Sequence, residues 1–465
     1  MKKNIIILSL AALTLTGCGV TKTYNREKVA QPIETENLYG DAQSGDSLGL
    51  GDLKWRELFT DPTLQALIER VLAQNTDMKN ADLSIQQVEY ALKAAKLAFA
   101  PSISLSANGS VSKMWDPYDR AAYSNIPNSK PYNIGMTLGW QQVNFLQLRN
   151  AKKGAEMTVE QARAAKQSVQ SSLVSNTAIM YYTLAQLDEQ LVLMKQTKAN
   201  WAEYLKMQKL LMDAGQANAA AVASVEATYW SICQSEVTIS DNIRILENQL
   251  STLLNEPSAK IQRNSLRSFV KPSIIETGAP ISILSRRPDV RIAEATLASA
   301  FYKVNEAKSA FYPSLTLSAT GTFTNGTQAT INPGAFIGQA IAALAQPIFQ
   351  NGRLVANLKI SKAQMEIEAN DFTNTVISAG NEVNTAMLKV RSAEELRVMI
   401  DNQVNAQQTA YDATRKLFAD SPANYLNVIT AHNNLIQAQM TQISNRMESI
   451  NATVELYLAL GGGIQ

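Results

Sequence analysis

The sequence is poor in the residues that most enzymes and metal sites use. It has one histidine, His432, and two cysteines, Cys18 and Cys233, among 465 residues. Histidine is the usual metal ligand and the usual general base near neutral pH, so an ordinary hydrolase or metalloenzyme is disfavoured. Two cysteines cannot form a disulfide framework. We therefore expect no enzyme activity, no cofactor and no metal site, and we expect Cys233 to be a small core residue.

Charge is also scarce, and neither sign dominates. Only 18% of the residues are charged, with 42 basic residues against 40 acidic ones. Without a basic excess or a basic run, binding to nucleic acid is disfavoured. A hydrophobic content of 46% disfavours wholesale disorder.

The first residues have the pattern of an export signal. Lys2 and Lys3 precede a short apolar stretch, residues 5–15, which ends in Leu-Thr-Gly-Cys18. This ending resembles a bacterial lipobox, which predicts a signal peptide over 1–17 and a lipidated, extended segment over 18–60. Gly19 is compatible with sorting to the outer membrane. An ordinary signal peptide with an incidental cysteine is the alternative. The sequence after this segment contains no run of 18 consecutive apolar residues, so we expect no membrane-spanning helix there.

An internal repeat organises the rest of the chain. Residues 72–112 align without a gap with residues 284–324, and the shared residues include Asp77 with Asp289 and Tyr90 with Tyr302. The densest match joins Ala-Phe-Ala-Pro-Ser-Ile-Ser-Leu-Ser-Ala-Asn-Gly109 to Ala-Phe-Tyr-Pro-Ser-Leu-Thr-Leu-Ser-Ala-Thr-Gly321. The sequence thus predicts a duplication, with structural repeats over 61–270 and 271–465.

Each repeat contains a segment in which apolar and polar residues alternate. The segments are 102–113 and 314–324, with 133–145 as the expected partner strand of the first. Residues 334–349 are a weaker partner, because Ala342 and Ala343 break the alternation. Alternation over this length is typical of membrane β-strands with one face toward lipid and one toward a wet lumen. A strand of a soluble sandwich is the alternative.

The distribution of proline predicts long helices. No proline occurs between Pro131 and Pro257 or between Pro347 and Pro422. We expect helices over 148–214 and 217–255 in the first repeat and over 352–418 and 422–460 in the second. The longest would measure roughly 100 Å at 1.5 Å per residue. Apolar residues in alternating steps of four and three predict a coiled-coil seam, formed by Phe372, Val376, Ala379, Val383, Ala386, Val390 and Ala393.

Several phrases of the sequence resemble one known family. They are Lys54-Trp-Arg-Glu-Leu-Phe-Thr-Asp-Pro-Thr-Leu64, Ser285-Arg-Arg-Pro-Asp-Val-Arg291, Phe311-Tyr-Pro-Ser-Leu315, Pro347-Ile-Phe-Gln-Asn-Gly-Arg353 and Leu456-Tyr-Leu-Ala-Leu-Gly-Gly-Gly463. Together they are similar to the TolC-type outer-membrane efflux proteins, in the lipoprotein branch that serves RND pumps. The resemblance extends from about residue 50 to the end of the chain.

The resemblance implies a mainly α-helical fold with a membrane β-barrel part. Three copies would form a twelve-stranded barrel continuous with a periplasmic coiled-coil tunnel. The implied partners are two further copies of the chain, a periplasmic adaptor, an inner-membrane RND transporter and outer-membrane lipid. The implied location is the outer membrane, with a lipid anchor and a long periplasmic extension.

Two helical turns and one short motif are the candidate sites. The hairpin tips, at Gly215 and Asn218 and at Ser421 and Asn424, would face the adaptor. The resemblance implies gate positions at Phe418, Asn427 and Thr430, with Asp420 close by. The acidic and tyrosine side chains that the family has at these positions are missing here. This difference predicts a tip closed by apolar packing and by amide or hydroxyl hydrogen bonds. Asp420 is alternatively a helix-end surface residue. The family motif is Arg286-Arg287-Pro288-Asp289, in which Pro288 suits a first helical turn and Asp289 the positive end of a helix dipole.

The sequence therefore predicts the exit duct of a tripartite RND-type efflux pump, which passively conducts drugs or other small toxic solutes. Two alternatives stay open. The same fold could serve an ABC-type export or protein-secretion system, or the chain could be a non-channel coiled-coil lipoprotein.

Overall fold

A computed structural model describes residues 22–30, 50–111, 132–272, 285–324, 335–420 and 425–463. It contains two compact units. The first, here called the sheet unit, combines Met1–Gln31, Ile85–Gln161 and Ala293–Phe372. The second, the helical unit, combines Pro32–Ser84, Ala162–Ile292 and Thr373–Gln465. Each unit draws on both of the repeats that the sequence predicts, so the compact units do not follow the repeat boundary.

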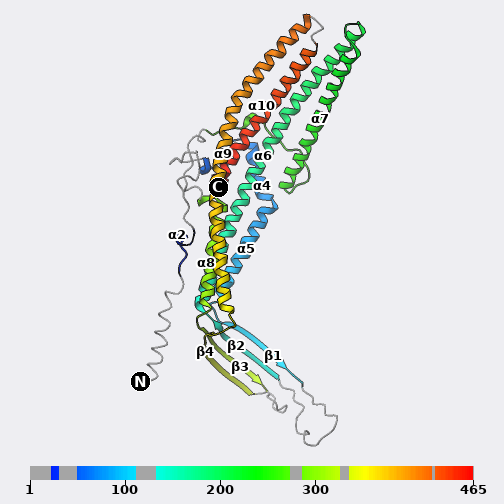
Figure 1. The fold of residues 1–465 in the computed structure, drawn as a ribbon. Helices are drawn as coiled ribbons and strands as arrows, with labels where there is room; N and C mark the ends of the chain where they lie inside the picture. The colour runs from blue at the N-terminus through cyan, green and yellow to red at the C-terminus, as the bar shows by residue number, and fades with distance from the viewer. Residues whose placement is uncertain are drawn as a thin grey trace, which may run out of the picture. The chain divides into compact units, whose positions relative to one another are not determined.

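The sheet unit is built on four antiparallel strands in the order β1-β2-β3-β4. Their bounds are Ser102–Gly109 for β1, Tyr132–Val143 for β2, Ser314–Thr324 for β3 and Ala335–Ala345 for β4. Figure 1 shows the four strands side by side. The ladder between β2 and β3 joins the two repeats, and its register shifts between Trp140 and Val143.

The register aligns the alternating residues of neighbouring strands on two faces. One row runs from Leu105 through Met136 and Gly321 to Gly338, and its side chains form an apolar face. The next row runs from Ser104 through Thr137 and Thr320 to Gln339 and is polar. The hydroxyls of Thr137 and Thr320 lie 3.1 Å apart on this polar face. The alternation read from the sequence is therefore a true division of the sheet into two faces.

Strand β4 departs from this division. Ile337 pairs with Thr322 and Ile341 pairs with Ser318, so two large apolar side chains lie on the otherwise polar face. The expected weakness of this strand's alternation is thus present in the structure. Its physical reason is the run Ala-Ile-Ala-Ala-Leu-Ala345, which offers no polar residue at the alternate positions.

Helices join the strands in the sheet unit, and Asn144 makes the junction between β2 and α6 (Phe145–Asp213). Its side-chain oxygen accepts hydrogen bonds from the backbone N–H groups of Leu146 and Gln147. Its amide nitrogen donates to the carbonyl of Ser309, the last residue of α8 (Pro288–Ser309), at 2.7 Å. One buried asparagine therefore caps one helix and ties it to the end of another.

Four helices lie partly in the sheet unit and partly in the helical unit. They are α5 (Thr76–Leu97), α6, α8 and α9 (Arg353–Asp420). The sequence predicts long helices over 148–214 and 352–418; α6 has 69 residues and α9 has 68, without an interruption in either. Each is thus about 100 Å long at 1.5 Å per residue. Among the described residues, no helix combines the length and apolar character that crossing a membrane would require.

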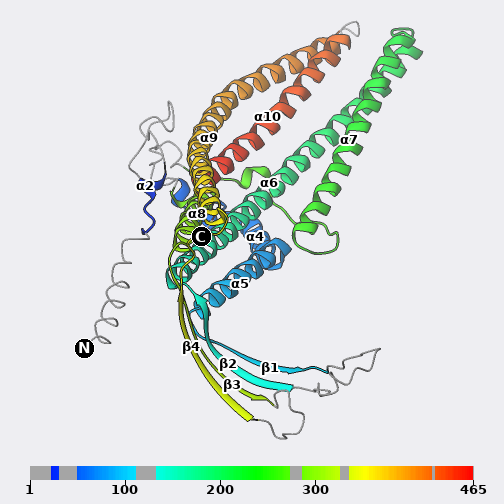
Figure 2. The same cartoon turned by 60° about the horizontal axis from the view of Figure 1, so that its bottom comes forward.

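The helical unit consists of two antiparallel helix pairs and the shorter elements beside them. Figures 1 and 2 show α7 (Ala219–Leu253) running back along α6 and α10 (Tyr425–Ala459) along α9. Ion pairs join each pair of helices: Lys198 to Glu236 at 2.8 Å, and Lys389 to Glu455 at 2.7 Å. The shorter elements are η2 (Leu50–Asp52), α3 (Trp55–Leu58), α4 (Pro62–Gln74) and η4 (Leu266–Ser268). One further short helix, α2 (Arg26–Val29), belongs to the sheet unit.

The seam that the sequence predicts along α9 is confirmed by burial. Phe372, Ala379, Val383, Ala386, Val390 and Ala393 are buried, and Val376 is half-buried. Asn445 of α10 donates a hydrogen bond to the carbonyl of Ala393 at 3.4 Å, so α10 covers part of this seam. The small side chains at every seventh position allow that close approach.

Candidate functional site: hairpin tips, family motif and anchored segment

The first hairpin tip is closed by the two residues that the sequence singles out. Gly215 has a φ of +74°, a left-handed conformation that favours glycine because other side chains clash there. Asn218 precedes α7, and its side-chain oxygen accepts a hydrogen bond from the N–H of Ala221 at 2.8 Å. Gly215 thus ends α6 and begins the reversal, and Asn218 caps the helix that returns.

The second tip is described only in part. Phe418 and Asp420 are the last turn of α9, while Ser421 and Asn424 lie outside the described residues. Asn427 and Thr430 are exposed on the first turns of α10, and Val428 between them is buried. Their spacing of three residues places Asn427 and Thr430 on one side of the helix. Contact between Phe418 and these two residues stays a prediction.

The family motif begins α8 as its composition suggests. Pro288 is the first helical residue and Asp289 lies in the first turn. Asp289 accepts a hydrogen bond from the N–H of Val290 at 2.9 Å, which places its charge at the positive end of the helix. Arg286 is exposed, whereas Arg287 is buried. The two neighbouring arginines therefore have different roles.

Arg287 is the centre of a charged cluster within the helical unit. Its Nη2 lies 2.7 Å from Oδ2 of Asp289 and 2.5 Å from Oε2 of Glu382 on α9. Its Nη1 donates to the carbonyl of Ala459, the last residue of α10, at 2.9 Å. Burial alone would raise the pKa of Asp289, but the hydrogen bond and charge of Arg287 hold that pKa below its ordinary value. The cluster joins α8, α9 and α10.

A cavity of about 520 Å³ lies beside this cluster. Its wall combines the charged pairs with small and polar side chains, and it includes the ion pair of Lys389 with Glu455 at 2.7 Å. The lining residues are Arg287, Asn381, Glu382, Thr385, Ala386, Lys389, Glu455, Leu458 and Ala459. Gly461, with a φ of +77°, lets the chain turn beside Arg287 directly after α10.

Sequence reasoning missed a second buried hub, Asp61. This carboxylate caps α4 through the N–H of Thr63 and also accepts from the hydroxyls of Tyr181 and Ser268 and the amide of Asn264. Burial would raise its pKa, but these hydrogen bonds lower it overall. The signal was available in Asp-Pro-Thr, since Asp before Pro is a typical helix start. The partners from distant segments were not visible in the sequence.

A third hub, Arg263, was also missed. Its guanidinium is almost fully buried and pairs with Asp188 of α6 at 2.6 Å and with Glu247 of α7 at 2.6 Å. It thereby holds the segment after α7 against both helices of the first hairpin. A single arginine in a polar segment gives no local signal of this role.

The segment that follows the leader lies against α8 in the sheet unit. Asn305 donates to the carbonyl of Lys22 at 3.0 Å, and the rings of Tyr24 and Phe301 meet edge to face at 5.8 Å. Arg26 lies 3.7 Å from Glu294. The segment therefore runs antiparallel to α8, with its earlier residues toward the end of α8 that leads to β3. Cys18 itself lies outside the described residues.

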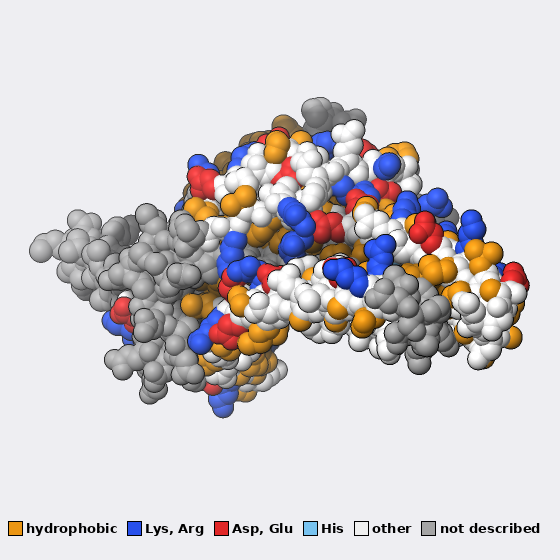
Figure 3. Space-filling view, turned by 90° about the horizontal axis from the view of Figure 1, so that it is seen from above, with side chains coloured by type: hydrophobic (Ala, Val, Ile, Leu, Met, Phe, Trp, Pro, Cys, Tyr) orange, Lys and Arg blue, Asp and Glu red, His pale blue; other side chains and the backbone are white. Residues whose placement is uncertain are grey.

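The described residues give no sign of a metal site. No group of three or more His, Cys, Asp or Glu side chains in that part of the chain could hold an ion. Cys233 is only half-buried in α7, so the expectation of a core residue is met in part. On the face drawn in Figure 3, positive and negative side chains are interspersed.

The chain matches the outer membrane efflux protein family over residues 67–256 and 279–462. It is 27% identical to a toluene efflux pump outer membrane protein, TtgC of Pseudomonas putida, over all of this chain and 96% of that protein. It is 25% identical to the cation efflux system protein CusC of Escherichia coli, over 97% of this chain and 98% of that protein.

Solved structures share its fold. The open state of the MtrE outer membrane channel of Neisseria gonorrhoeae superimposes with a TM-score of 0.83 at 22% identity, over 96% of this chain and 98% of that one. The fold class is therefore that of the TolC-type channels, mainly helical with a β-sheet part. Since the family match extends over both repeats, the chain belongs to the outer membrane efflux protein family and is an outer-membrane efflux channel.

Proposed function

We propose that the protein is the passive, trimeric exit duct of a tripartite RND-type efflux pump, through which drugs or other small toxic solutes leave the periplasm. The observation that carries the proposal is the four-stranded sheet. Its outer strands, β1 and β4, each pair on one side only among the described residues. Its apolar face presents Ile103, Leu105 and Met136, all more than half exposed.

An open sheet of this kind cannot remain alone in a bilayer. Unpaired N–H and C=O groups in hydrocarbon cost several kcal/mol each, so membrane sheets close into barrels. One copy supplies four strands, fewer than the eight of the smallest membrane barrels. Pairing β1 of one copy with β4 of the next would close the sheet, and three copies would supply twelve strands.

The position of residues 22–26 supports a lipid anchor at Cys18. Lys22 is held by Asn305, nine residues before β3 begins at Ser314. Four residues of chain reach at most about 14 Å, so an acylated Cys18 would be held near the start of the strands. Two or more acyl chains would give stable anchoring, which a single chain does not provide.

The hairpin tips are the proposed docking site for the periplasmic adaptor. Gly215 and Asn218 shape the first tip, and Ser421 and Asn424 correspond to them in the second. Phe418, Asn427, Thr430 and Asp420 are the proposed constriction. Asn427 and Thr430 are exposed in one copy, which leaves them available to face other copies around an axis.

Two measurements test the duct. Native mass spectrometry of the purified protein in detergent should give a trimer, and planar bilayers should show ion conductance. A monomer without conductance would refute the duct. Dye efflux from cells tests the energy source of the pump. An uncoupler that collapses the proton gradient should stop efflux through an RND pump at once. Efflux that continues on ATP alone would assign the duct to an ABC-type system.

A further inference from the structure

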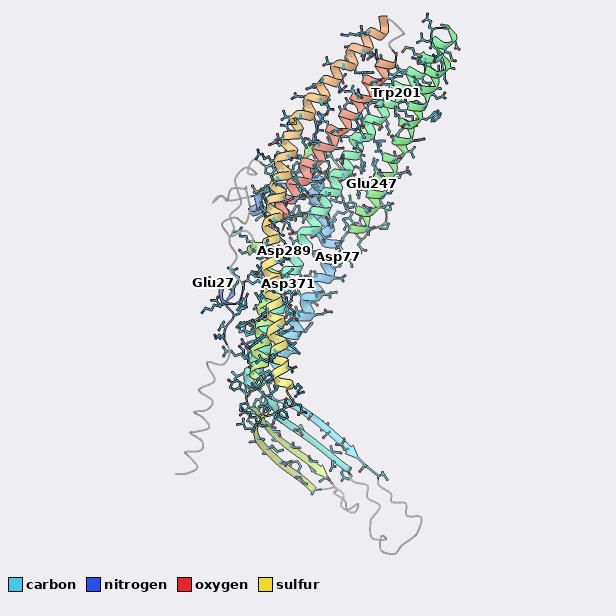
Figure 4. The ribbon with its side chains drawn as sticks, in the orientation of Figure 1. Glu27, Asp77, Trp201, Glu247, Asp289 and Asp371 are labelled. Atoms are coloured by element: carbon cyan, nitrogen blue, oxygen red, sulfur yellow. The ribbon has the colours of Figure 1, made fainter. Side chains whose placement is uncertain are left out.

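The only histidine of the chain lies inside an aromatic cluster in the helical unit. His432, on α10, is 4% exposed. Its ring stacks on Tyr411 of α9, with centroids 4.6 Å apart, and on Trp201 of α6, with centroids 5.9 Å apart. Tyr204 of α6 meets it edge-on at 6.0 Å. We call Trp201, Tyr204, Tyr411 and His432 the aromatic cluster; Figure 4 labels Trp201 on its helix.

The aromatic cluster joins the two helical hairpins of one copy. The hydroxyls of Tyr204 and Tyr411 lie 3.0 Å apart, so α6 and α9 are linked directly. Trp201 also packs against Val225 and Ile232 of α7. Tyr411 packs against Val428 and Leu435 of α10. All four long helices of the helical unit therefore contribute to the aromatic cluster or pack against it.

The imidazole is poorly provided with hydrogen-bond partners. Its Nδ1 is buried and makes no hydrogen bond with any described residue. Burial lowers the pKa of His432 to about 4. At neutral pH the ring is therefore uncharged and contributes to the cluster through stacking.

The groups around the ring offer no compensating charge. The titratable groups that face it are the hydroxyls of Tyr204, from α6, and Tyr411, from α9. Burial and the hydrogen bond with Tyr411 raise the pKa of Tyr204, so its hydroxyl remains neutral in acid. Arg415 lowers the pKa of Tyr204 and Glu203 raises it. The contacts from α7 and α10, through Val225, Ile232, Val428 and Leu435, are apolar. In the described part of the chain, no ionised group shifts the pKa of His432.

The aromatic faces introduce an opposing effect. Trp and Tyr faces attract a cation, so stacking on Trp201 and Tyr411 would favour an imidazolium. A face does not accept the hydrogen bond of an in-plane N–H, however, and a protonated ring carries two of them. The buried Nδ1 would then need an acceptor, and it makes no hydrogen bond with any described residue, including the tyrosine hydroxyls, which bond to each other.

We propose that His432 makes the joint between the α6–α7 and α9–α10 hairpins acid-sensitive: the neutral ring holds them together, and the protonated ring releases them and widens the tip of the duct. Because free histidine has a pKa of 6.5, the stabilisation is complete above about pH 6.5 and is lost as the pH falls toward 4. At pH 4 the equilibrium between joined and released hairpins shifts by on the order of 100-fold. The release of the hairpins does not depend on the proposed function. Only the expected effect of that release on conductance rests on the proposed function.

Since the chain has one histidine, labelling histidine with ¹³C gives a single imidazole signal when the purified channel carries a tag without histidine. A titration from pH 7.5 to 3.5 should show a midpoint near 4. A midpoint at or above 6.5 would overturn the inference, because the ring would then be hydrated or held as a cation.

Hydrogen exchange of residues 427–440, corrected for the intrinsic effect of pH, tests the release. Between pH 7 and pH 4 the wild type should lose protection by on the order of 100-fold. His432→Phe keeps a ring that cannot be protonated and should retain protection, and His432→Gln serves the same purpose if the phenylalanine variant fails to fold. Tyr411→Phe, the matched control, keeps the stack but loses the hydroxyl contact with Tyr204, so its protection should be lower at both pH values and should fall between them by the same factor as in the wild type. If His432→Phe lost as much protection from exchange as the wild type, the effect of acid would be assigned to carboxylates and the inference would be refuted.

Planar-bilayer recordings at pH 7 and pH 4 complete the test. Conductance of the wild type should rise at pH 4, and that of His432→Phe should stay constant. A rise of equal size in both proteins would refute the role of His432 in opening the duct. If no variant conducts at any pH, the duct is refuted, while the titration and the exchange data still decide whether His432 releases the hairpins.

Discussion

Arg287 donates a hydrogen bond from Nη1 to the carbonyl of Ala459, 172 residues further along the chain. The same guanidinium holds Asp289 at the start of α8 and Glu382 in α9. Arg287, which directly precedes α8, therefore holds the end of α10 through the main-chain carbonyl of Ala459. This contact gives the Arg-Arg-Pro-Asp motif a structural role that its spacing alone does not suggest.

Replacing Arg287 by alanine should destabilise the helical unit by about 2–4 kcal/mol. The change leaves the carbonyl of Ala459 unpaired and two carboxylates without their cation. The expected loss is below that of a fully buried pair, because both carboxylates are about half exposed. Urea denaturation of the purified protein measures the change. Arg286→Ala is the matched control at the exposed neighbour, and an equal effect of the two substitutions would contradict the special role of Arg287.

The two faces of the sheet predict opposite effects for adjacent residues of β1. Leu105→Arg would place a charge on the apolar face and should cost about 2–4 kcal/mol near the middle of the bilayer, so that assembly into the membrane fails. Ser104→Arg, on the polar face, should assemble and change the ion selectivity of the conductance. Heat-resistant oligomers on gels and bilayer recordings report the two outcomes. Normal assembly of Leu105→Arg would show that this face does not meet lipid.

Acid should weaken the hub around Asp61. Its pKa is lowered in the folded protein, so the stability that it contributes is full above about pH 4 and is lost as the pH falls through the lowered pKa. Asp61→Asn keeps the helix cap but loses acceptors for Tyr181 and Ser268, and should cost about 1–3 kcal/mol at pH 7. As the pH falls through this lowered pKa, the variant and the wild type should converge. Asp82→Asn breaks an exposed pair with Lys166 and should cost less than about 1 kcal/mol.

The two cysteines allow a clean test of the lipid anchor. Cys18→Ser should abolish the incorporation of labelled palmitate, and Cys233→Ser should leave it unchanged. Cells that express each variant are labelled, and the immunoprecipitated protein is counted. Label retained by Cys18→Ser would refute the lipobox.

Features with a repeating pattern could be predicted from the sequence. The seam of α9 follows from steps of four and three, and burial confirms six of its seven residues. The faces of β1, β2 and β3 follow from strict alternation. Pro288 at the start of α8 follows from the fixed φ of proline, which suits a first turn. In each case the signal is local, because the spacing of residues determines which side of a helix or strand they occupy.

Features that depend on distant partners could not be predicted. Asp61 meets Asn264, which lies 203 residues later, and Arg263 meets Asp188 and Glu247 from two helices. The sequence presents His432 as an isolated residue that binds no metal, and it gives no sign of the three aromatic rings around it. The division into two units was also unforeseen, since α5, α6, α8 and α9 each contribute residues to both.

The pairing of β2 with β3 has a consequence for the time course of folding. It joins Asn133 to Thr324, with all of α6, α7 and α8 between them in the chain. Closing so large a loop is slow, because its entropy must be lost before the ladder forms. During synthesis the central ladder cannot be complete until residue 324 of 465 has left the ribosome. The hairpin of β1 and β2 therefore waits, with β2 unpaired on one side, while residues 144–324 are synthesised, and during this period its open edge needs protection from aggregation.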